Sequence, residues 1–230
     1  MRKLKIISVL TIALLVISIY SVYSYDLPKQ FLFDKEGSLK EWQEKVFKNK
    51  VIYVVEAEGK GGYLSAKSEA ACSGLFYRIR FDTRKLPMIS WHWKVTEFPE
   101  KAKSDPATLD AKEGWIEKDD YAARVYVIFP RLNFTRTESI EYIWDENLPE
   151  ETIMTSPYFE NIKLIVVESG KNGKGKWIFE ERNIYEDYKK AFGRAPATRV
   201  GAIAVMTDTD NTLSTAEALY KDMKVGYKNE

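Results

Sequence analysis

Short apolar segments with a period of two constrain this chain more than any other feature of its sequence. From residue 51 onward they recur along the chain, separated by polar breaks, and they are rich in Val, Ile, Tyr, Phe and Trp. Such alternation is typical of β-strands that bury one face. The expected strands span residues 51–57, 75–81, 89–95, 122–129, 162–168, 177–182, 201–207 and 221–227.

One internal segment has the pattern of a helix instead. Asn183 can cap residues 184–192, whose aromatic side chains share one face, and Gly193 can end the helix. Many strands, one short helix and no strand–helix alternation favour an all-β, antiparallel β-sandwich over a parallel sheet. The chain has 230 residues and no internal repeat, so we expect a single domain over residues 25–230.

Residues 1–24 have the pattern of an export signal. A basic start precedes an apolar run over residues 6–19, and Val22 and Ser24 precede a cleavage point at Tyr25. We therefore expect a signal peptide on an exported protein that is periplasmic, secreted or held outside the cytoplasmic membrane. The alternative is an uncleaved N-terminal anchor, because the run approaches the roughly 20 residues that span a bilayer. Membrane contact is expected only through this segment.

Charge and composition exclude several classes of function. The chain has 35 Lys and Arg against 34 Asp and Glu; without Arg2, Lys3 and Lys5 of the leader the balance is 32 against 34, or −2. A broad face for nucleic acid therefore has no electrostatic support. One Cys and one His exclude a Cys/His zinc site and an intrachain disulfide framework.

Two long polar connections interrupt the strands, at residues 97–118 and 131–161. Long loops in compact domains are often functional. These two carry Trp115 and Trp144, whose rings can stack on the C–H face of a sugar. The alternative for the second connection is a hidden strand at residues 139–144.

Trp91, His92 and Trp93 stand together in one expected strand. The two tryptophans share a face with Val95, which favours a place in the core, although a platform for a sugar ring has the same pattern. His92 then points to the other face. A general base needs an orienting carboxylate, and the neighbouring sequence offers none, so His92 is interpreted as an ordinary sheet-face residue that can contact a ligand.

Charged side chains interrupt several apolar strands. Arg124 stands mid-strand after Asp120, and Glu168, Arg182 and Asp208 follow apolar runs. A buried charge is costly unless it is paired, so we expect these groups to converge on one concave face. There Arg124 grips a carboxylate of an acidic sugar or of an internal ion-pair network. The carboxylates that could instead serve as acid or base are Asp120, Glu168, Glu180, Glu181 and Asp208.

Asp208, Asp210 and Asn211 form a short acidic run after an expected strand. Their oxygens suit Ca²⁺ as a structural ion. An EF-hand is excluded, because the sixth and twelfth positions counted from Asp208 are Leu213 and Leu219 rather than Gly and Glu. The alternative is a turn whose side chains bond their own backbone.

Together these motifs resemble an uncharacterised bacterial family catalogued as domain of unknown function 3047. The resemblance runs over residues 31–227 and implies an exported, single-domain protein, but supplies no activity. It rests on Trp91-His92-Trp93-Lys94-Val95, the run from Asp119 to Tyr126, Tyr142-Ile143-Trp144, Glu168-Ser169-Gly170, Trp177, Arg182-Asn183, Glu186-Asp187-Tyr188, Ala191-Phe192-Gly193 and the run from Met206 to Thr212.

A second resemblance concerns the fold alone. The opening Phe31, Leu39 and Trp42, with the closing Tyr220 and Asp222, look like jelly-roll domains of the galactose-binding type. That resemblance implies a jelly-roll sandwich; such domains often bind glycans and hold a structural Ca²⁺.

Three functions follow from these patterns. The first is a non-catalytic module that binds a carbohydrate or another cell-envelope polymer. The second is a polysaccharide hydrolase or lyase, favoured by two carboxylates across an open cleft and disfavoured by carboxylates locked onto Arg124 and Arg182 under a closed surface. The third is an envelope scaffold or protein-interaction domain. The candidate ligand-binding residues are Arg124, Asp120, His92, Trp115, Trp144, Glu168 and Arg182.

Overall fold

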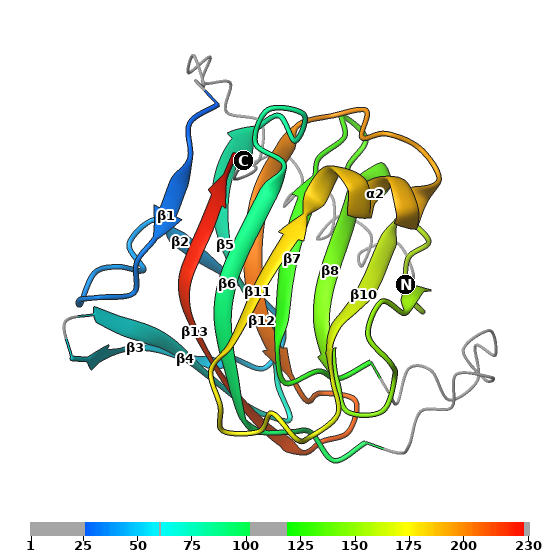
Figure 1. Ribbon diagram of the computed structural model, residues 1–230. Coiled ribbons are helices and arrows are strands. Elements are labelled where there is room, and N and C mark those ends of the chain that lie inside the picture. The colour runs from blue at the N-terminus through cyan, green and yellow to red at the C-terminus, as the bar shows by residue number, and fades with distance from the viewer. Residues whose placement is uncertain (1–25, 60, 102–118, 228–230) are drawn as a thin grey trace, which may run out of the picture.

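The computed structural model describes residues 26–59, 61–101 and 119–227 and shows two β-sheets packed face to face (Figure 1). Sheet A has the order β11-β6-β13-β4-β3, with β1 beside β13; sheet B has the order β2-β5-β12-β7-β8-β10-β9. The strands are β1 (Lys29–Phe31), β2 (Trp42–Lys48), β3 (Ile52–Glu58), β4 (Gly61–Glu69), β5 (Cys72–Phe81), β6 (Met88–Glu97), β7 (Arg124–Phe129), β8 (Glu138–Asp145), β9 (Ile153–Thr155), β10 (Ile162–Ser169), β11 (Ile178–Asn183), β12 (Val200–Asp208) and β13 (Thr215–Gly226).

The strand pairing is nested. β4 pairs with β13, β5 with β12, β6 with β11 and β7 with β8, and all four pairs are antiparallel. Along the chain these eight strands alternate between the sheets, except at the innermost pair. An antiparallel ribbon rolled up in this way is a jelly roll. The prediction of an all-β jelly-roll sandwich is therefore confirmed.

The remaining strands extend the two sheets. β1, β2 and β3 come from the N-terminal part, and β9 and β10 are inserted between β8 and β11. β10 lies parallel to β8, with a register shift between Val166 and Glu168. The expected antiparallel pairing thus holds apart from this one inserted strand among those described.

The core between the sheets is strongly aromatic. Trp91 and Trp93 on β6 are fully buried, whereas His92 between them is half-buried. Trp91 packs on Tyr142 with ring centroids 5.4 Å apart, and Trp93 packs on Trp144 at 5.8 Å, so β6 of sheet A meets β8 of sheet B. Burying one such side chain contributes about 1.5–3 kcal/mol. The core interpretation of Trp91 and Trp93 is correct, and a sugar platform there is excluded.

The helix α2 (Ile184–Phe192) has the predicted bounds. The side chain of Asn183 accepts a hydrogen bond from the backbone N–H of Glu186, and Gly193 ends the helix with φ of 68°. The ring of Tyr188 packs on Phe129 at 4.8 Å, so the helix covers one end of the sandwich (Figure 1). Within the described ranges, no helix has the length and apolar character needed to cross a bilayer.

Five strands lie outside the segments expected from the sequence: β1, β2, β4, β8 and β9. β4 was hidden by its polar composition and by glycines that read as a turn; a Cβ on Gly62 would lie 2.2 Å from the carbonyl oxygen of Phe33, so glycine is needed for close packing. β8 lies within the expected 131–161 loop, which confirms the hidden-strand alternative. Trp144 therefore lies in a strand and is fully buried, and its prediction as a stacking platform on a loop is wrong. Trp115 lies outside the described residues.

Candidate functional site

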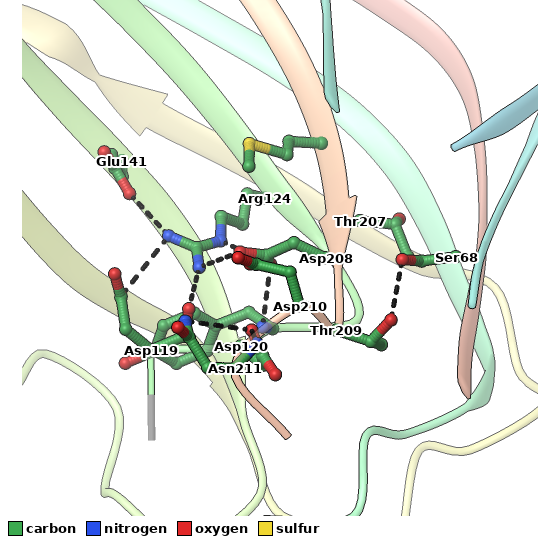
Figure 2. A network of polar contacts seen from close by, with 12 residues as sticks. Ser68, Asp119, Asp120, Arg124, Glu141, Thr207, Asp208, Thr209, Asp210 and Asn211 are labelled. Carbon is green, nitrogen blue, oxygen red and sulfur yellow. Dashed lines mark hydrogen bonds and ion pairs between the residues drawn. The ribbon is translucent and has the colours of Figure 1, made fainter. Parts of the chain in front are cut away.

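Arg124 forms a buried ion network at the start of β7 (Figure 2). Its Nε and Nη2 donate to the two carboxylate oxygens of Asp208 at 3.0 and 2.6 Å. Its Nη1 donates to Glu141 at 3.0 Å and to Asp119 at 3.5 Å. Arg124 is 3% exposed, and the three carboxylates are 3–6% exposed. Side chains from β7, β8 and β12 thus meet under a closed surface.

Asp120 has a different partner. Its carboxylate accepts hydrogen bonds from the backbone N–H groups of Asn211 and Thr212 at 3.3 and 2.7 Å, and from the side-chain amide of Asn211 at 3.3 Å. It is fully buried. Asp120 therefore fixes the turn after β12, and its oxygens face the protein rather than solvent.

A second buried ion cluster adjoins the first. The ammonium of Lys101 lies 3.0 Å from Asp145 and 2.8 Å from Glu146, and all three side chains are nearly fully buried. The ring of Tyr121 lies between the two clusters, with Lys101 at 4.0 Å and Arg124 at 4.5 Å from its centroid. Cation–π contact with one ring therefore links the two clusters.

The Arg124 network carries more negative than positive charge. Burial raises the pKa of Asp119, of Glu141 and of Asp208 to about 7 each, although Arg124 opposes the shift in every case. One guanidinium compensates one carboxylate, so further buried carboxylates retain protons. The network links β7, β8 and β12 of sheet B and the chain before β7.

The burial of the carboxylates argues against acid–base catalysis by this network. The carboxylates of Asp120 and Asp208 are buried and accept hydrogen bonds from the protein, which is the arrangement expected of carboxylates with a structural role. A catalytic acid or base must reach a substrate atom. The internal ion-pair alternative for Arg124 is thus the one that fits, and its use as a direct grip on an acidic sugar does not.

The predicted cation ligands converge only in part. Cys72, Asp208 and Asp210 each place a ligand atom within 4.8 Å of the others. Asp208 already accepts two hydrogen bonds from Arg124, and Lys48 lies 3.8 Å from the carboxylate of Asp210. Burial raises the pKa of the Cys72 thiol and disfavours the thiolate that binds metals. Asn211 bonds Asp120 and Tyr158 instead. The donor set therefore fits Ca²⁺ poorly.

The other predicted ligand-binding residues lie away from this network. Arg182 pairs with Asp187 at 2.9 Å and with Glu151 beside α2. Glu168 is half-buried on β10. His92 lies on the outer face of sheet A, where Nδ1 is 3.3 Å from a carboxylate oxygen of Asp222. The expectation that the strand-interrupting charges converge on one face is wrong for Glu168 and Arg182.

Asp222 supplies the orienting carboxylate that the sequence near His92 lacks. Asp222 lies in β13 where the register with β6 shifts between Lys221 and Lys224, and its backbone has φ of 53°. Only the pairing of β6 with β13 brings it to His92, so no local signal reveals it. The ring of Phe179 flanks His92 at 5.0 Å.

Glu180 is a carboxyl group with no ion-pair partner among the described residues. It is paired in register with Trp91 and shares its inward face, and its Oε1 atom is buried with no hydrogen-bond partner among the described residues. Burial raises the pKa of Glu180 to about 8, and the charge of Glu168 adds to the shift. Glu180 is therefore mainly protonated at neutral pH.

The sequence patterns missed an aromatic strip on the outer face of sheet B, formed by Gly74, Phe76, Tyr126 and Ala204. Ala204 pairs with Phe76 on one side and with Tyr126 on the other. The two aromatic residues lie two strands apart in one row, so their Cα atoms are roughly 10 Å apart. Both side chains are half-buried, whereas Ala204 between them and Gly74 beside Phe76 on β5 are small and buried.

Gly74 sets the position of the Phe76 ring. A Cβ on Gly74 would lie 2.6 Å from Cε2 and 3.0 Å from Cζ of Phe76, so the ring lies over the glycine. The hydroxyl of Tyr126 contacts the sulfur of Met206 at 3.2 Å, which fixes that ring. Alternation in β5 and β7 places these residues on the outer face, but only the strand order places them side by side.

Residues 40–224 match the family model described as "Protein of unknown function (DUF3047)". The chain belongs to this family. A search of curated proteins gives no match.

Solved structures with overlapping folds are distant from this DUF3047 protein. A family 30 carbohydrate-binding module of a Clostridium thermocellum cellulase is 7% identical, with 89% of this chain and 99% of that chain covered and a TM-score of 0.44. An endoglucanase from Rhodothermus marinus is 10% identical, with 88% and 99% covered and a TM-score of 0.44.

A third overlap involves only part of a larger protein. The glycoside hydrolase domain of Endo-D from Streptococcus pneumoniae is 9% identical, with 82% of this chain but 22% of that chain covered and a TM-score of 0.40. All three scores are below 0.5, so the jelly-roll assignment of the DUF3047 protein rests on its own strand pairing.

Replacing Arg124 by Met should lower the free energy of unfolding by about 3–5 kcal/mol, because it leaves buried carboxylates without their cation. Urea denaturation measures the change. Lys189→Met, which removes an exposed pair with Glu186, is the matched control and should change stability by about 0.5 kcal/mol or less. Equal stability of the two variants would contradict the structural role of the network.

The free energy of unfolding should fall as the pH rises from about 5 to 8. Asp119, Glu141, Asp208 and Glu180 have pKa values raised to about 7 or 8 in the folded chain, whereas unfolded carboxylates ionise near pH 4. The folded chain therefore binds more protons over this interval, and stability decreases with pH. Urea denaturation at stepped pH checks the slope.

Glu180→Gln should make that slope shallower, because it removes one of the four titrating groups and keeps the shape of the side chain. The control is Glu186→Gln on the exposed face of α2, for which the wild-type slope is expected. Stability that rises over the same interval in the wild type would show that the buried carboxylates are ionised.

Chelator should leave the melting temperature unchanged, because Arg124 already neutralises Asp208. A ligand bound only by the folded state would stabilise it, so EDTA and then added Ca²⁺ are compared by differential scanning calorimetry. A fall with EDTA that Ca²⁺ reverses would establish a structural ion at Asp208 and Asp210.

Proposed function

We propose that this protein is a non-catalytic binding module for a carbohydrate or another cell-envelope polymer, and that the polymer lies on the aromatic strip. The observation that carries the proposal is the pair of half-buried rings, Phe76 and Tyr126, in one row of an open sheet face. Aromatic rings give large, rigid contact area for the apolar face of a sugar. Their separation is comparable with the length of a disaccharide.

Polar side chains border the strip and can bond the hydroxyl groups of such a ligand. Gln43 and Lys45 on β2 pair in register with Phe76 and Gly74, and Arg78 on β5 pairs with Ala202 in the next row. All three are exposed. Apolar platforms with a few polar groups at their border are typical of ligand sites.

The outer face of sheet A is less suitable. Its largest ring, Trp177, has the ammonium groups of Lys221 and Lys94 at 4.1 and 4.7 Å from its centroid, and Tyr63 packs against its edge at 5.9 Å. Lys221 also pairs with Glu58 at 2.7 Å. A ligand would have to displace these contacts, whereas Phe76 needs no such change.

The two alternatives to a binding module differ in the observations that favour them. The closed Arg124 network supports binding over the hydrolase or lyase alternative. The scaffold alternative is favoured by exposed apolar side chains: Phe47 on β2 and Ile52 and Val54 on β3 are 45–61% exposed at neighbouring edges of the two sheets.

The proposal includes export, since residues 1–24 have the pattern of a signal peptide and a cell-envelope polymer lies outside the cytoplasm.

Phe76→Ala and Tyr126→Ala should each weaken binding to the preferred polysaccharide by about tenfold, because each removes one stacking ring. A panel of neutral and acidic polysaccharides is screened by affinity electrophoresis, and the best ligand is measured by calorimetry. Gly74→Ala should have a smaller effect in the same direction, because its Cβ displaces the Phe76 ring.

The matched control is Phe179→Ala, which removes an exposed Phe from the outer face of sheet A and should leave affinity unchanged. Binding that survives both Phe76→Ala and Tyr126→Ala would place the ligand elsewhere. Absence of binding to every polysaccharide, with self-association through the β2 and β3 edges, would favour the scaffold alternative.

A further inference from the structure

Two adjoining hollows lie at one end of the sandwich, beside the chain that leaves α2. The larger, with a volume of about 540 Å³, is lined by Arg131, Leu132, Asn133, Arg136, Glu138 and Thr198. The smaller, about 150 Å³, lies between residues 82–84 and 196–199. Thr198 lines both, so the hollows are contiguous. The larger has the size of a small-molecule site.

The charges around the hollows are unbalanced. Glu138 is shared by Arg131 at 2.8 Å and by Arg194. Asp26 is shared by Lys85 and Arg199, each at 3.0 Å, and Asp82 pairs with Arg84 at 2.6 Å. Arg136 is exposed and has no carboxylate partner in the described part of the chain. Six cations thus face three carboxylates, an excess of three positive charges.

The carboxylates there are all stabilised in their ionised form, unlike those around Arg124. Hydrogen bonds from Arg84 lower the pKa of Asp82 to about 2. Burial raises the pKa of Glu138, but hydrogen bonds from Tyr188, Arg131 and Arg194 outweigh it and leave that pKa below its ordinary value. The pKa of Asp26 is likewise lowered by Lys85 and Arg199 despite burial. Each of these carboxylates is therefore ionised and balances one cation, which leaves the positive excess unchanged.

Thr198 adds a polar group without a partner. Its Oγ1 is buried, and no described residue offers it a hydrogen bond. A buried hydroxyl that lacks a partner is costly, and one that borders a hollow can donate to a bound oxygen atom. Leu132, fully exposed, supplies an apolar wall at the rim.

We infer that the larger hollow binds a small anionic sugar, one that carries a carboxylate or a phosphate group. Arg136 and Arg131 hold the anionic group through planar N–H pairs, and the hydroxyl of Thr198 donates to one of its oxygens. Leu132 contacts the apolar face of the ring. This site lies at the end of the sandwich and is independent of the aromatic strip on the sheet face.

The test is calorimetric titration of the whole chain at low salt with glucuronate, glucose 6-phosphate, inorganic phosphate and glucose. We expect glucuronate or glucose 6-phosphate, or both, to bind, with affinity that falls as salt is raised. Whichever of the two binds more tightly identifies the anionic group. Glucose should not bind, because it lacks the charge that the arginines recognise.

Three variants locate the site. Arg136→Ala should weaken binding by about tenfold or more, since it removes a charge-assisted contact and its side chain is exposed. Thr198→Val should weaken it less. Lys174→Ala removes an exposed positive charge from the turn before β11 and should change nothing. Phe76→Ala, which tests the aromatic strip, should also leave this binding intact.

Other outcomes would overturn the inference. No binding of glucuronate or of glucose 6-phosphate to the wild type would show that the excess charge serves no such ligand. Binding that Arg136→Ala leaves unchanged would place the anion elsewhere. Equal binding of glucose, or binding of inorganic phosphate as tight as that of both sugars, would show that the hollow does not recognise an anionic sugar.

Discussion

The pairing of one buried guanidinium with three buried carboxylates is the constraint on which the rest of sheet B depends. Arg124 can stay in the sandwich only because Asp208 and Glu141 arrive beside it from the two neighbouring strands. The network therefore links strand order to charge: a different neighbour for β7 would leave a buried charge uncompensated. It also anchors the backbone before β7, since Asp208 accepts the N–H of Tyr121 at 3.0 Å.

That constraint divides the outer face of sheet B into two regions. Over β8 and β10 the face is closed, because Ile143, Leu164 and Val166 are buried beneath Tyr121, Leu148 and Met154. Over β5, β12 and β7 the face is open, and there Phe76 and Tyr126 are half-buried beside Gly74 and Ala204. Arg124 and Asp120, two of the charged groups that the sequence suggests for ligand contact, are buried under the closed surface, whereas His92, Glu168 and Arg182 lie elsewhere. The open region carries rings and small residues instead, which is why the binding proposal moves to them.

The features of the fold that depend on local periodicity could be predicted from the sequence. The helix at Ile184–Phe192 was predictable because Asn183 and Gly193 encode its ends, and the burial of Trp91 and Trp93 follows from alternation in β6. What depends on strand neighbours was not predictable. Glu141 joins Arg124 through the pairing of β7 with β8, and Asp222 reaches His92 through a register shift in β13. Trp144 was assigned to a loop because β8 is buried on both faces and lacks a period of two.

The two ends of the molecule show opposite electrostatic behaviour, although the whole chain is nearly neutral. Around Arg124, carboxylates outnumber cations in a closed space, and burial raises the pKa of Asp119, Glu141 and Asp208. Around the hollows near α2, cations outnumber carboxylates at an open surface. A closed excess of negative charge is relieved by protons, so it needs no ligand. An open excess of positive charge is compensated by solvent ions or by a bound anion. Net charge alone conceals this difference, which decides where an anionic group can bind.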